Sequence, residues 1–343
     1  KMTNVSNHNY LKKMDLDELP KCPICSGCFS YHLSLHDVLL RQHKSYFNIY
    51  RCGSCYFLKI LPELTFNEIV SFYPEDYYSH QDYEAKEETG SFTHKIMDKL
   101  QDTILDLHYN KKSSSGLFLR SIAWFFRNSI ACMPLKQPKG SGMLLDVGSG
   151  SGYWIEKLSR YSWNCKGIDI IGKKSDKNII GDFLEVSFES KFEYIRAHGV
   201  IEHVIDPDKY IMRISALLEE NGECHISTPN SNCLSFKIFK KYWIGLEVPR
   251  HLQVFNDQNL ILLLKKHNLE VIGRSSELSS GAFISCIYVY LRDKFGIATP
   301  HPNVWFFLVI MFLPLDFFMK WINQSVNMVV IVNKKNNRQT TSS

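Results

Sequence analysis

The pattern of apolar and polar positions predicts a long C-terminal part in which strands and helices alternate. From residue 143 onward, short apolar runs are followed by segments whose apolar side chains recur every three or four positions. The expected strands are Met143–Val147, Asn164–Asp169, Asn178–Asp182, Phe192–His198, Glu223–Ser227 and Met328–Val332. This alternation favours an α/β fold, in which a mostly parallel sheet has helices on both faces.

Three helices are expected between these strands. Trp154–Tyr161 and Asp208–Glu220 have helical spacing, and Asn221-Gly222 is expected to end the second. Asn256 is a good N-cap for a helix that continues through Lys266, with Asn268 where a glycine often ends a helix.

The segment ahead of the strands also reads as helical. Thr65 and Glu68 have the spacing of a capping box. Residues 93–109 and 117–132 have apolar side chains at helical period, and the Pro/Gly-rich residues 136–142 have the composition of a linker.

A second apolar feature lies near the end of the chain. Val304–Leu315 is a run of twelve apolar residues, followed closely by Asp316 and Lys320. A bilayer span needs about 20 residues, and Pro314 is expected to interrupt the helix. A buried helix or a homodimer contact is therefore favoured, with docking of 304–322 on a membrane surface and a true span as the alternatives.

Composition narrows the class of protein. With 45% hydrophobic residues the chain can build a core, and a net charge of +5 is too small for a dedicated nucleic-acid binder. Residues 1–20 contain no apolar run of the kind found in secretory signals. Ten cysteines spread over 343 residues are not typical of a secreted, disulfide-linked domain, so we expect reduced thiols and a cytoplasmic location.

Four of the cysteines form two Cys-x-x-Cys pairs. Cys22 and Cys25 are separated from Cys52 and Cys55 by 26 residues, a spacing that can arrange four thiolates around one zinc ion. Four protein ligands leave no position for water, so the zinc would be structural. Cys28 is a spare or alternative ligand. The competing interpretation is a set of unligated thiols or a redox pair.

A glycine-rich loop follows the first strand of the α/β part. Gly148, Gly150 and Gly152 allow close approach of a ligand, but Tyr153 stands where a dinucleotide-binding fingerprint would have glycine. The acidic Asp146 before the loop suits a ligand with a cationic amine. Asp169, 21 residues after Gly148, can accept both hydroxyls of a ribose. An ordinary strand-to-helix turn is the alternative.

These residues resemble the first two motifs of the class I S-adenosylmethionine-dependent methyltransferases. Asp182, with Phe183 after it, matches the family position beside the adenine, and His198–Pro207 resembles the V-L-E-H-x-x-D-P stretch after the fourth strand. Ile226–Asn230 and Pro249–Leu252 resemble later family segments. The resemblance implies a Rossmann-like fold and S-adenosylmethionine as cofactor, with His198 lying against it.

The front of the chain resembles a subgroup of that family with an N-terminal zinc ribbon. Arg51–Cys55, Leu61-Pro62 and Phe72–Tyr78 carry this resemblance, and many members of the subgroup modify sugars. The expected organisation is a zinc ribbon with its lead-in at 1–62, a helical cap and linker at 63–140, a cofactor-binding methyltransferase domain at 141–333 with an apolar insertion at 300–322, and a polar tail at 334–343.

Methyl transfer to a hydroxyl requires removal of a proton, for which histidine is well suited near neutral pH. His203 with Glu202, and His251, are the candidate catalytic residues, although Glu202-His203 could equally hold the loop. The candidate substrate-binding residues are Arg250, which could bind a phosphate or carboxylate, Asn230, and Tyr77 and Tyr78. A solvated loop charge is the alternative for Arg250, and packing is the alternative for the tyrosines.

The leading hypothesis is methyl transfer to a hydroxyl of a sugar-containing small molecule, either nucleotide-linked or lipid-linked. The glycine and Glu-His motifs also resemble O-methyltransferases of lipid quinone precursors, which the apolar stretch favours and the ribbon does not. A nucleic-acid methyltransferase is less favoured, because the ribbon lacks a dense basic and aromatic stripe; no nucleic-acid partner is expected. A non-enzymatic scaffold would have no need of Asp146, the glycine loop and Asp169 together.

Overall fold

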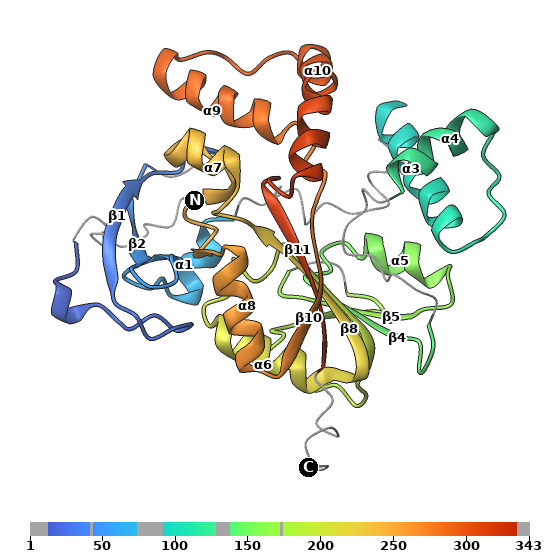
Figure 1. Ribbon diagram of the computed structural model, residues 1–343, viewed down its shortest axis with the longest axis horizontal. Coiled ribbons are helices and arrows are strands. Elements are labelled where there is room, and N and C mark those ends of the chain that lie inside the picture. Colours follow the sequence, from blue (N-terminus) through green and yellow to red (C-terminus); the bar gives the residue numbers. More distant parts are fainter. Residues whose placement is uncertain (1–12, 42–43, 74–91, 128–137, 172–173, 335–343) are drawn as a thin grey trace.

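The computed structural model describes residues 13–41, 44–73, 92–127, 138–171 and 174–334. Its centre is a seven-stranded sheet with the strand order β10-β11-β8-β7-β4-β5-β6 (Figure 1). The strands are β4 (Met143–Val147), β5 (Asn164–Asp169), β6 (Asn178–Ile180), β7 (Phe192–His198), β8 (Leu218–Pro229), β10 (Leu269–Ser276) and β11 (Asn327–Lys334). β11 is antiparallel to both neighbours and the other pairs are parallel. The predicted mostly parallel α/β sheet is confirmed.

Alternate side chains of the central strands bury against helices on opposite faces of this sheet. Leu145 and Ile195 share a core with residues of α6 (Pro207–Leu217) and α8 (Asp257–Lys266). Their neighbours Leu144 and Tyr194 share another core with residues of α3 (Phe92–His108) and α5 (Tyr153–Ser159). Both faces of β4 and β7 are therefore covered by helices, as is typical of central strands in a parallel sheet.

The N-terminal part forms a second sheet that is completed by a distant segment. Its order is β1-β2-β3-β9, with β1 (Phe29–Leu35), β2 (Phe47–Cys52), β3 (Leu58–Ile60) and β9 (Gln253–Val254). A short 3-10 helix, η1 (Leu16–Glu18), precedes it. Because Leu58 pairs with Val254, this sheet draws its last strand from the α/β part of the chain.

α1 (Phe66–Ser71) follows this sheet and starts at the predicted capping box. The Thr65 side chain accepts a hydrogen bond from Glu68 N, and the Glu68 carboxylate accepts one from Thr65 N. The next described helices are α3 and α4 (Leu117–Phe126). Residues 136 and 137 of the expected linker, and 128–132 of the expected second helix, lie outside the described residues.

Two long helices, α9 (Ala282–Phe295) and α10 (Pro302–Trp321), are inserted between β10 and β11 and rise above the sheet in Figure 1. α9 was not predicted from the sequence. The predicted break at Pro314 is wrong, because α10 continues through it. The predicted burial is also wrong: α10 contains a 19-residue apolar segment with a mean hydropathy of 1.7, of which 11% is buried. By length and composition alone, this helix could cross a membrane.

Two further boundaries differ from the predictions. α6 ends at Leu217 and β8 begins at Leu218, so Asn221-Gly222 lie within a strand and not at a helix end. Leu218 is fully buried and pairs with Phe192, and this burial outweighs the local preference of Asn-Gly for a cap. The remaining short helices are α7 (Leu234–Phe239), η2 (Lys240–Tyr242) and η3 (Ile244–Leu246).

Candidate active site and cysteine cluster

A cavity of about 1030 Å³ opens where the central parallel strands end. The loops after β4, β5, β7 and β10 line it, and α1 and α3 also contribute side chains to its lining. Ligands bind at this edge in open parallel sheets, and the volume reaches the upper end of ordinary small-molecule sites. The cavity is therefore large enough for two molecules that react with each other.

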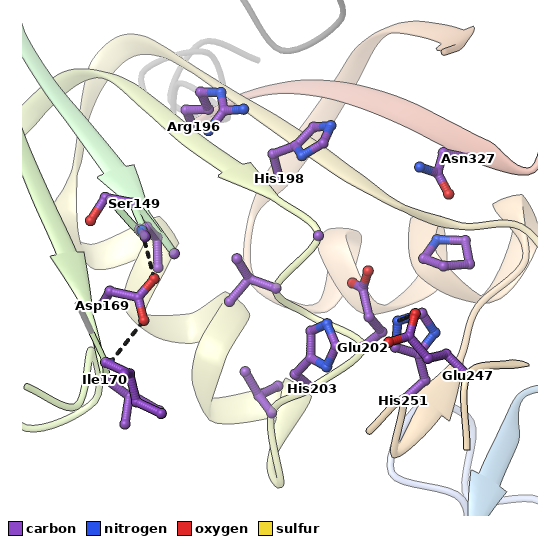
Figure 2. Close-up of a pocket in the computed structure, with 18 of the residues that line it drawn as sticks. Ser149, Asp169, Ile170, Arg196, His198, Glu202, His203, Glu247, His251 and Asn327 are labelled. Carbon is purple, nitrogen blue, oxygen red and sulfur yellow. Dashed lines mark hydrogen bonds and ion pairs between the residues drawn. The ribbon is translucent and has the colours of Figure 1, made fainter. Parts of the chain in front are cut away.

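The glycine loop after β4 forms one wall of the cavity. Gly148 has φ +74°, and a Cβ there would lie 2.3 Å from Val200 Cγ2, so no other residue fits without displacing the loop after β7. Gly150 N donates to Asp169 Oδ2 at 2.8 Å, and Asp169 Oδ1 accepts from Ile171 N at 3.1 Å (Figure 2). A carboxylate has about four acceptor positions, so ribose hydroxyls are compatible with these two bonds. Gly152, with φ +81°, is the N-cap of α5 and does not line the cavity.

Asp146 is not in the position expected of an amine-binding residue. It is 1% exposed and does not line the cavity, and its Oδ1 lies 2.7 Å from Arg196 Nη1. Its Oδ2 is buried without a hydrogen-bond partner among the described residues. Arg196 does line the cavity, next to the Trp154 ring. The expected direct contact of Asp146 with a ligand amine is thus replaced by a buried pair that neutralises a cavity-wall arginine.

The other predicted cofactor residues line the cavity. Asp182 is exposed, and its Oδ1 accepts from Leu184 N at 2.8 Å, while Phe183 is buried and packs edge-on against Tyr210. His198 Nε2 lies 2.5 Å from Glu277 Oε1. Burial by itself would raise the pKa of Glu277, but the charge of His198 and the hydrogen bonds from His198, Asn327 and Ser227 together lower it to about 2. His198 therefore has a permanent anionic partner.

All three predicted catalytic residues lie together on the cavity wall across from Asp169 (Figure 2). The rings of His203 and His251 meet edge-to-face with centroids 4.7 Å apart. Glu202 is buried and accepts a hydrogen bond from Thr228 Oγ1 at 2.9 Å. One ligand atom from each of Glu202, His203 and His251 falls within 4.8 Å of the others, so the group could also hold a metal ion.

Hydrogen bonds define which nitrogen of His203 is basic. Its Nδ1 lies 3.0 Å from the Arg250 carbonyl oxygen, which can only accept, so Nδ1 carries the hydrogen and Nε2 has the lone pair in the neutral ring. The Tyr73 hydroxyl lies 3.0 Å from the same Nδ1. Burial and the neighbouring His251 lower the pKa of His203 below its ordinary value of 6.5. The ring is therefore neutral at neutral pH, with Nε2 ready to accept a proton.

Glu247 completes this group and was not recognised in the sequence. Its Oε2 lies 3.7 Å from His251 Nε2, and its Oε1 accepts from Arg250 Nε at 3.0 Å. Burial would raise the pKa of Glu247, but the charges of His251 and Arg250 lower it overall. Its position shortly before Pro249-Arg250-His251 could have marked Glu247 as a site residue in the sequence. No such sequence signal marks Glu277, because its partner His198 is 79 residues away in the chain.

The predicted substrate-binding residues are not brought to the cavity. Arg250 is 0% exposed, with Asp37 and Glu247 as carboxylate partners at 3.1 and 3.0 Å, so its predicted role in binding an anionic acceptor is corrected to an internal structural one. Asn230 is buried, does not line the cavity and accepts from Asn232 N at 2.9 Å. Tyr77 and Tyr78 lie outside the described residues.

The cavity wall is rich in acidic side chains. Lys209 and Arg196 are the permanent cations of the described lining, and Arg196 is paired with Asp146. The lining carboxylates are Asp98, Asp169, Asp182, Glu202, Asp206, Glu247 and Glu277. This balance favours a cationic ligand and disfavours one with several phosphates.

The four predicted metal ligands converge in the N-terminal sheet. Cys22 Sγ lies 3.7 Å from Cys55 Sγ and Cys25 Sγ lies 3.4 Å from Cys52 Sγ, and all four sulfurs lie within 4.8 Å of one another. Tetrahedral zinc with bonds of about 2.3 Å would separate sulfurs by roughly 3.8 Å, so this donor set fits zinc. Cys28 is exposed, with its sulfur 3.3 Å from Lys21 Nζ, and is not part of the cluster.

The two cysteine pairs have the same backbone structure. In each, the residue after the second cysteine, Ser26 or Tyr56, has a φ near +60° and donates its N–H to the carbonyl of the first cysteine. Gly27 is required in the first pair, because a Cβ there would lie 2.6 Å from Ser54 Oγ. Two matched turns thus point four thiols at a common centre.

Comparisons with known proteins give a methyltransferase match for part of this chain. Residues 119–273 match a family model described as a methyltransferase domain. The ubiquinone biosynthesis O-methyltransferase of Bradyrhizobium diazoefficiens is 32% identical over 147 residues, which are 39% of this chain and 54% of that protein. The enzyme of the same name from Pelagibacter ubique is 30% identical over 157 residues, 40% of this chain and 64% of that protein. The chain spans about half to two thirds of the length of these relatives.

Among solved structures, the chain is similar to the 1,6-didemethyltoxoflavin-N1-methyltransferase of Burkholderia thailandensis. It is 13% identical, with a TM-score of 0.41, and the match covers 90% of this chain and all of that one. Residues 119–273 are thus similar to a methyltransferase domain, over somewhat less than half of the chain. The matched residues exclude the cysteine cluster and the α9–α10 hairpin, so both features lie outside the matched segment.

Proposed function

We propose that this protein is an O-methyltransferase that transfers a methyl group from S-adenosylmethionine to a hydroxyl of a small acceptor without phosphate groups, with His203 as the general base. The observation that carries the proposal is the unprotonated Nε2 of His203 in a cavity that also contains the glycine loop and Asp169. The curated relatives are named as O-methyltransferases of ubiquinone biosynthesis. A lipid quinone-type phenol is therefore the favoured acceptor.

The residues that would hold the cofactor are those of the β4–β5 edge. Asp169 would accept the ribose hydroxyls, Asp182 and Phe183 would lie beside the adenine, and the loop at Gly148 and Gly150 would follow the part of the cofactor between them. When bound, S-adenosylmethionine supplies an electrophilic methyl group on a positively charged sulfur. The carboxylate-rich wall suits that charge.

The acceptor hydroxyl would lie against the histidine wall. The hydroxyl proton would pass to His203 Nε2 as the acceptor oxygen takes up the methyl group that bound S-adenosylmethionine would supply. The Arg250 carbonyl and Tyr73 hydroxyl hold the opposite side of the ring at 3.0 Å, which fixes the direction of Nε2. Glu202, which precedes His203 in the sequence, stabilises the imidazolium cation that forms when His203 accepts the proton.

A nucleotide-linked sugar fits this cavity less well than a phenol. Arg250, the side chain expected to bind a phosphate, is buried between two carboxylates, and the lining has seven carboxylates. A neutral glycoside remains compatible with the charge balance. The four-cysteine cluster is proposed to bind one structural zinc ion, which stabilises the N-terminal sheet and takes no part in methyl transfer.

The test is calorimetric titration with S-adenosylmethionine and S-adenosylhomocysteine, with NAD as the control, followed by an acceptor panel. We expect the first two to bind and NAD not to bind. In the panel, a catechol with a prenyl chain should be methylated, whereas a nucleotide-linked sugar should not be. Absence of S-adenosylmethionine binding would refute the cofactor assignment, and preference for the nucleotide sugar would refute the acceptor class.

A further inference from the structure

We propose that α4, α7 and the α9–α10 hairpin form one docking surface for an anionic lipid bilayer, with α10 lying in the interface. The seven most exposed large apolar side chains among the described residues all lie on α4, α9 and α10. They are Leu117, Phe118, Trp124, Phe125, Phe295, Phe307 and Trp321, with exposed fractions from 59% to 82%. Exposed apolar area of this kind is typical of a contact surface and not of ordinary solvent-facing helices.

These helices form a continuous unit at one end of the molecule. Phe317 of α10 contacts the rings of Phe125 and Phe126 of α4, with centroids 5.4 and 5.2 Å apart. On the other side, Phe312 of α10 stacks on Phe283 of α9. Figure 1 shows α4, α9 and α10 at the end opposite the C-terminus.

Contacts along one side of α10 indicate that it lies on a membrane and does not cross it. Asp316 Oδ2 accepts a hydrogen bond from Gly281 N at 2.7 Å, at the start of α9, and Asp316 is 4% exposed. Val309, on the same helix, packs so closely on Gly281 that a Cβ there would lie 2.9 Å from it. Met319 is also buried. A helix held to the domain on one side can place only its other side in lipid.

The charges around the surface specify an anionic partner. No acidic residue occurs in α4 or in the α7–η2 segment. Of the two acidic residues of the hairpin helices, Asp316 is buried, and Asp293 accepts a hydrogen bond from the Tyr242 hydroxyl and lies 3.9 Å from Arg41. The exposed charges of α4, its C-cap and α7–η2 are Arg120, Arg127, Lys237, Lys240 and Lys241. Arg127 also stacks on the exposed Trp124, at 4.1 Å, an arrangement suited to the boundary between headgroups and acyl chains.

The surface is continuous with the cavity. Both ends of the hairpin line it, with Leu278 and Ala282 at its start and Val326 and Asn327 after it. A molecule carried in the bilayer would therefore meet the rim of the active site. The docking itself requires neither cofactor nor methyl transfer, so it goes beyond the proposed function and can fail independently of it.

The experiment is co-sedimentation of the full chain with vesicles of phosphatidylcholine, with and without phosphatidylglycerol. We expect binding that is stronger with phosphatidylglycerol and weaker at high salt. The double variant Phe118→Ser/Phe307→Ser should bind at least about tenfold more weakly. The double variant Lys240→Gln/Lys241→Gln should lose the preference for phosphatidylglycerol.

The matched control is Leu262→Ser/Met212→Ser, which removes two apolar side chains, 48% and 53% exposed, from α8 and α6. It should bind vesicles like the wild type. Unchanged S-adenosylhomocysteine binding and circular dichroism show that each variant is folded. Equal vesicle binding of the Phe118/Phe307 variant and the wild type would overturn the proposal. Dimerisation that this variant abolishes, without vesicle binding by the wild type, would also overturn it and assign the surface to a second copy of the chain.

Discussion

Replacing His203 by asparagine separates its proposed chemical role from its structural one. The asparagine amide nitrogen can occupy the position of Nδ1 and keep the hydrogen bond to the Arg250 carbonyl oxygen, which lies 3.0 Å from Nδ1 in the wild type. It has no counterpart of Nε2. A general base contributes roughly 10²–10⁴-fold to a rate, so kcat should fall by that factor, or about 3–5 kcal/mol of transition-state stabilisation. Because the buried hydrogen bond survives, the free energy of unfolding should change by less than about 1 kcal/mol.

The assay is initial-rate methylation of a prenylated catechol at saturating cofactor, together with cofactor affinity and thermal unfolding. His267→Asn is the matched control, because His267 pairs with Asp208 outside the cavity; it should retain the wild-type kcat. Retention of kcat within about tenfold in His203→Asn would refute the assignment of the base.

The pH profile provides a second measurement on the same residue. Only neutral His203 can accept the proton, and burial together with His251 lowers its pKa in the folded protein below 6.5. Activity should therefore be flat through neutral pH and fall only below 6.5. The same shift makes stability depend on pH. The unfolded chain binds the His203 proton more tightly than the folded protein does, so the free energy of unfolding is highest above pH 6.5. It decreases as the pH falls toward the lower pKa that His203 has in the folded protein. A fall in wild-type activity that already begins above pH 6.5 as the pH is lowered would contradict a lowered pKa of His203.

Three further predictions concern the cofactor wall, the buried arginine and the cysteine cluster. Asp169→Ala should weaken S-adenosylhomocysteine binding by on the order of 2–4 kcal/mol in calorimetry; wild-type affinity would exclude the ribose assignment. Asp37→Ala leaves Arg250 without one of its two carboxylates inside the protein and should lower the free energy of urea unfolding by about 3–5 kcal/mol. Lys177 and Glu156 form an ion pair that is exposed on both sides. The control variant Glu156→Ala should therefore lower the free energy of unfolding by at most about 1 kcal/mol. Equal losses in the two variants would show that Arg250 is not a buried structural charge. Elemental analysis should find one zinc ion per chain in the wild type and in Cys28→Ser, but none in Cys52→Ser, which should also unfold at a lower temperature; zinc retained by Cys52→Ser would disprove the ligand set.

The sequence predicted the elements whose signals are local. β4 was predicted because its two buried faces give a nearly uniform apolar run. Thr65 and Asn256 were recognised as caps because the capping interaction spans only three residues. The histidine group was predicted because Glu202 and His203 follow directly after a strand end. Local signals failed where a tertiary contact decided the outcome: Leu218, buried against Phe192, extends β8 through Asn221-Gly222.

Charged residues were the hardest to interpret, because their roles depend on partners that are remote in sequence. Arg250 was expected to bind substrate, but Asp37, 213 residues earlier, neutralises it. Asp146 was expected to bind a ligand amine, but Arg196, 50 residues later, pairs with it. In the sequence, Asp316 ends the apolar run that begins at Val304, and in the structure its carboxylate accepts a hydrogen bond from the Gly281 amide inside the protein.

That last contact explains how a helix as apolar as α10 can carry a carboxylate and still present an uncharged outer surface. Burial raises the pKa of Asp316, and the amide of Gly281 partly offsets this. The Asp316 side chain holds α10 to the base of α9, beside residues that line the cavity.

Asp316→Leu should therefore leave the apolar outer side of α10 intact while loosening the hairpin from the cavity rim. If the hairpin positions a membrane-borne acceptor, this variant will still bind anionic vesicles but will methylate a vesicle-embedded prenylated catechol more slowly than a water-soluble catechol, relative to the wild type. An equal effect on both acceptors would show that the hairpin does not guide the acceptor to the site.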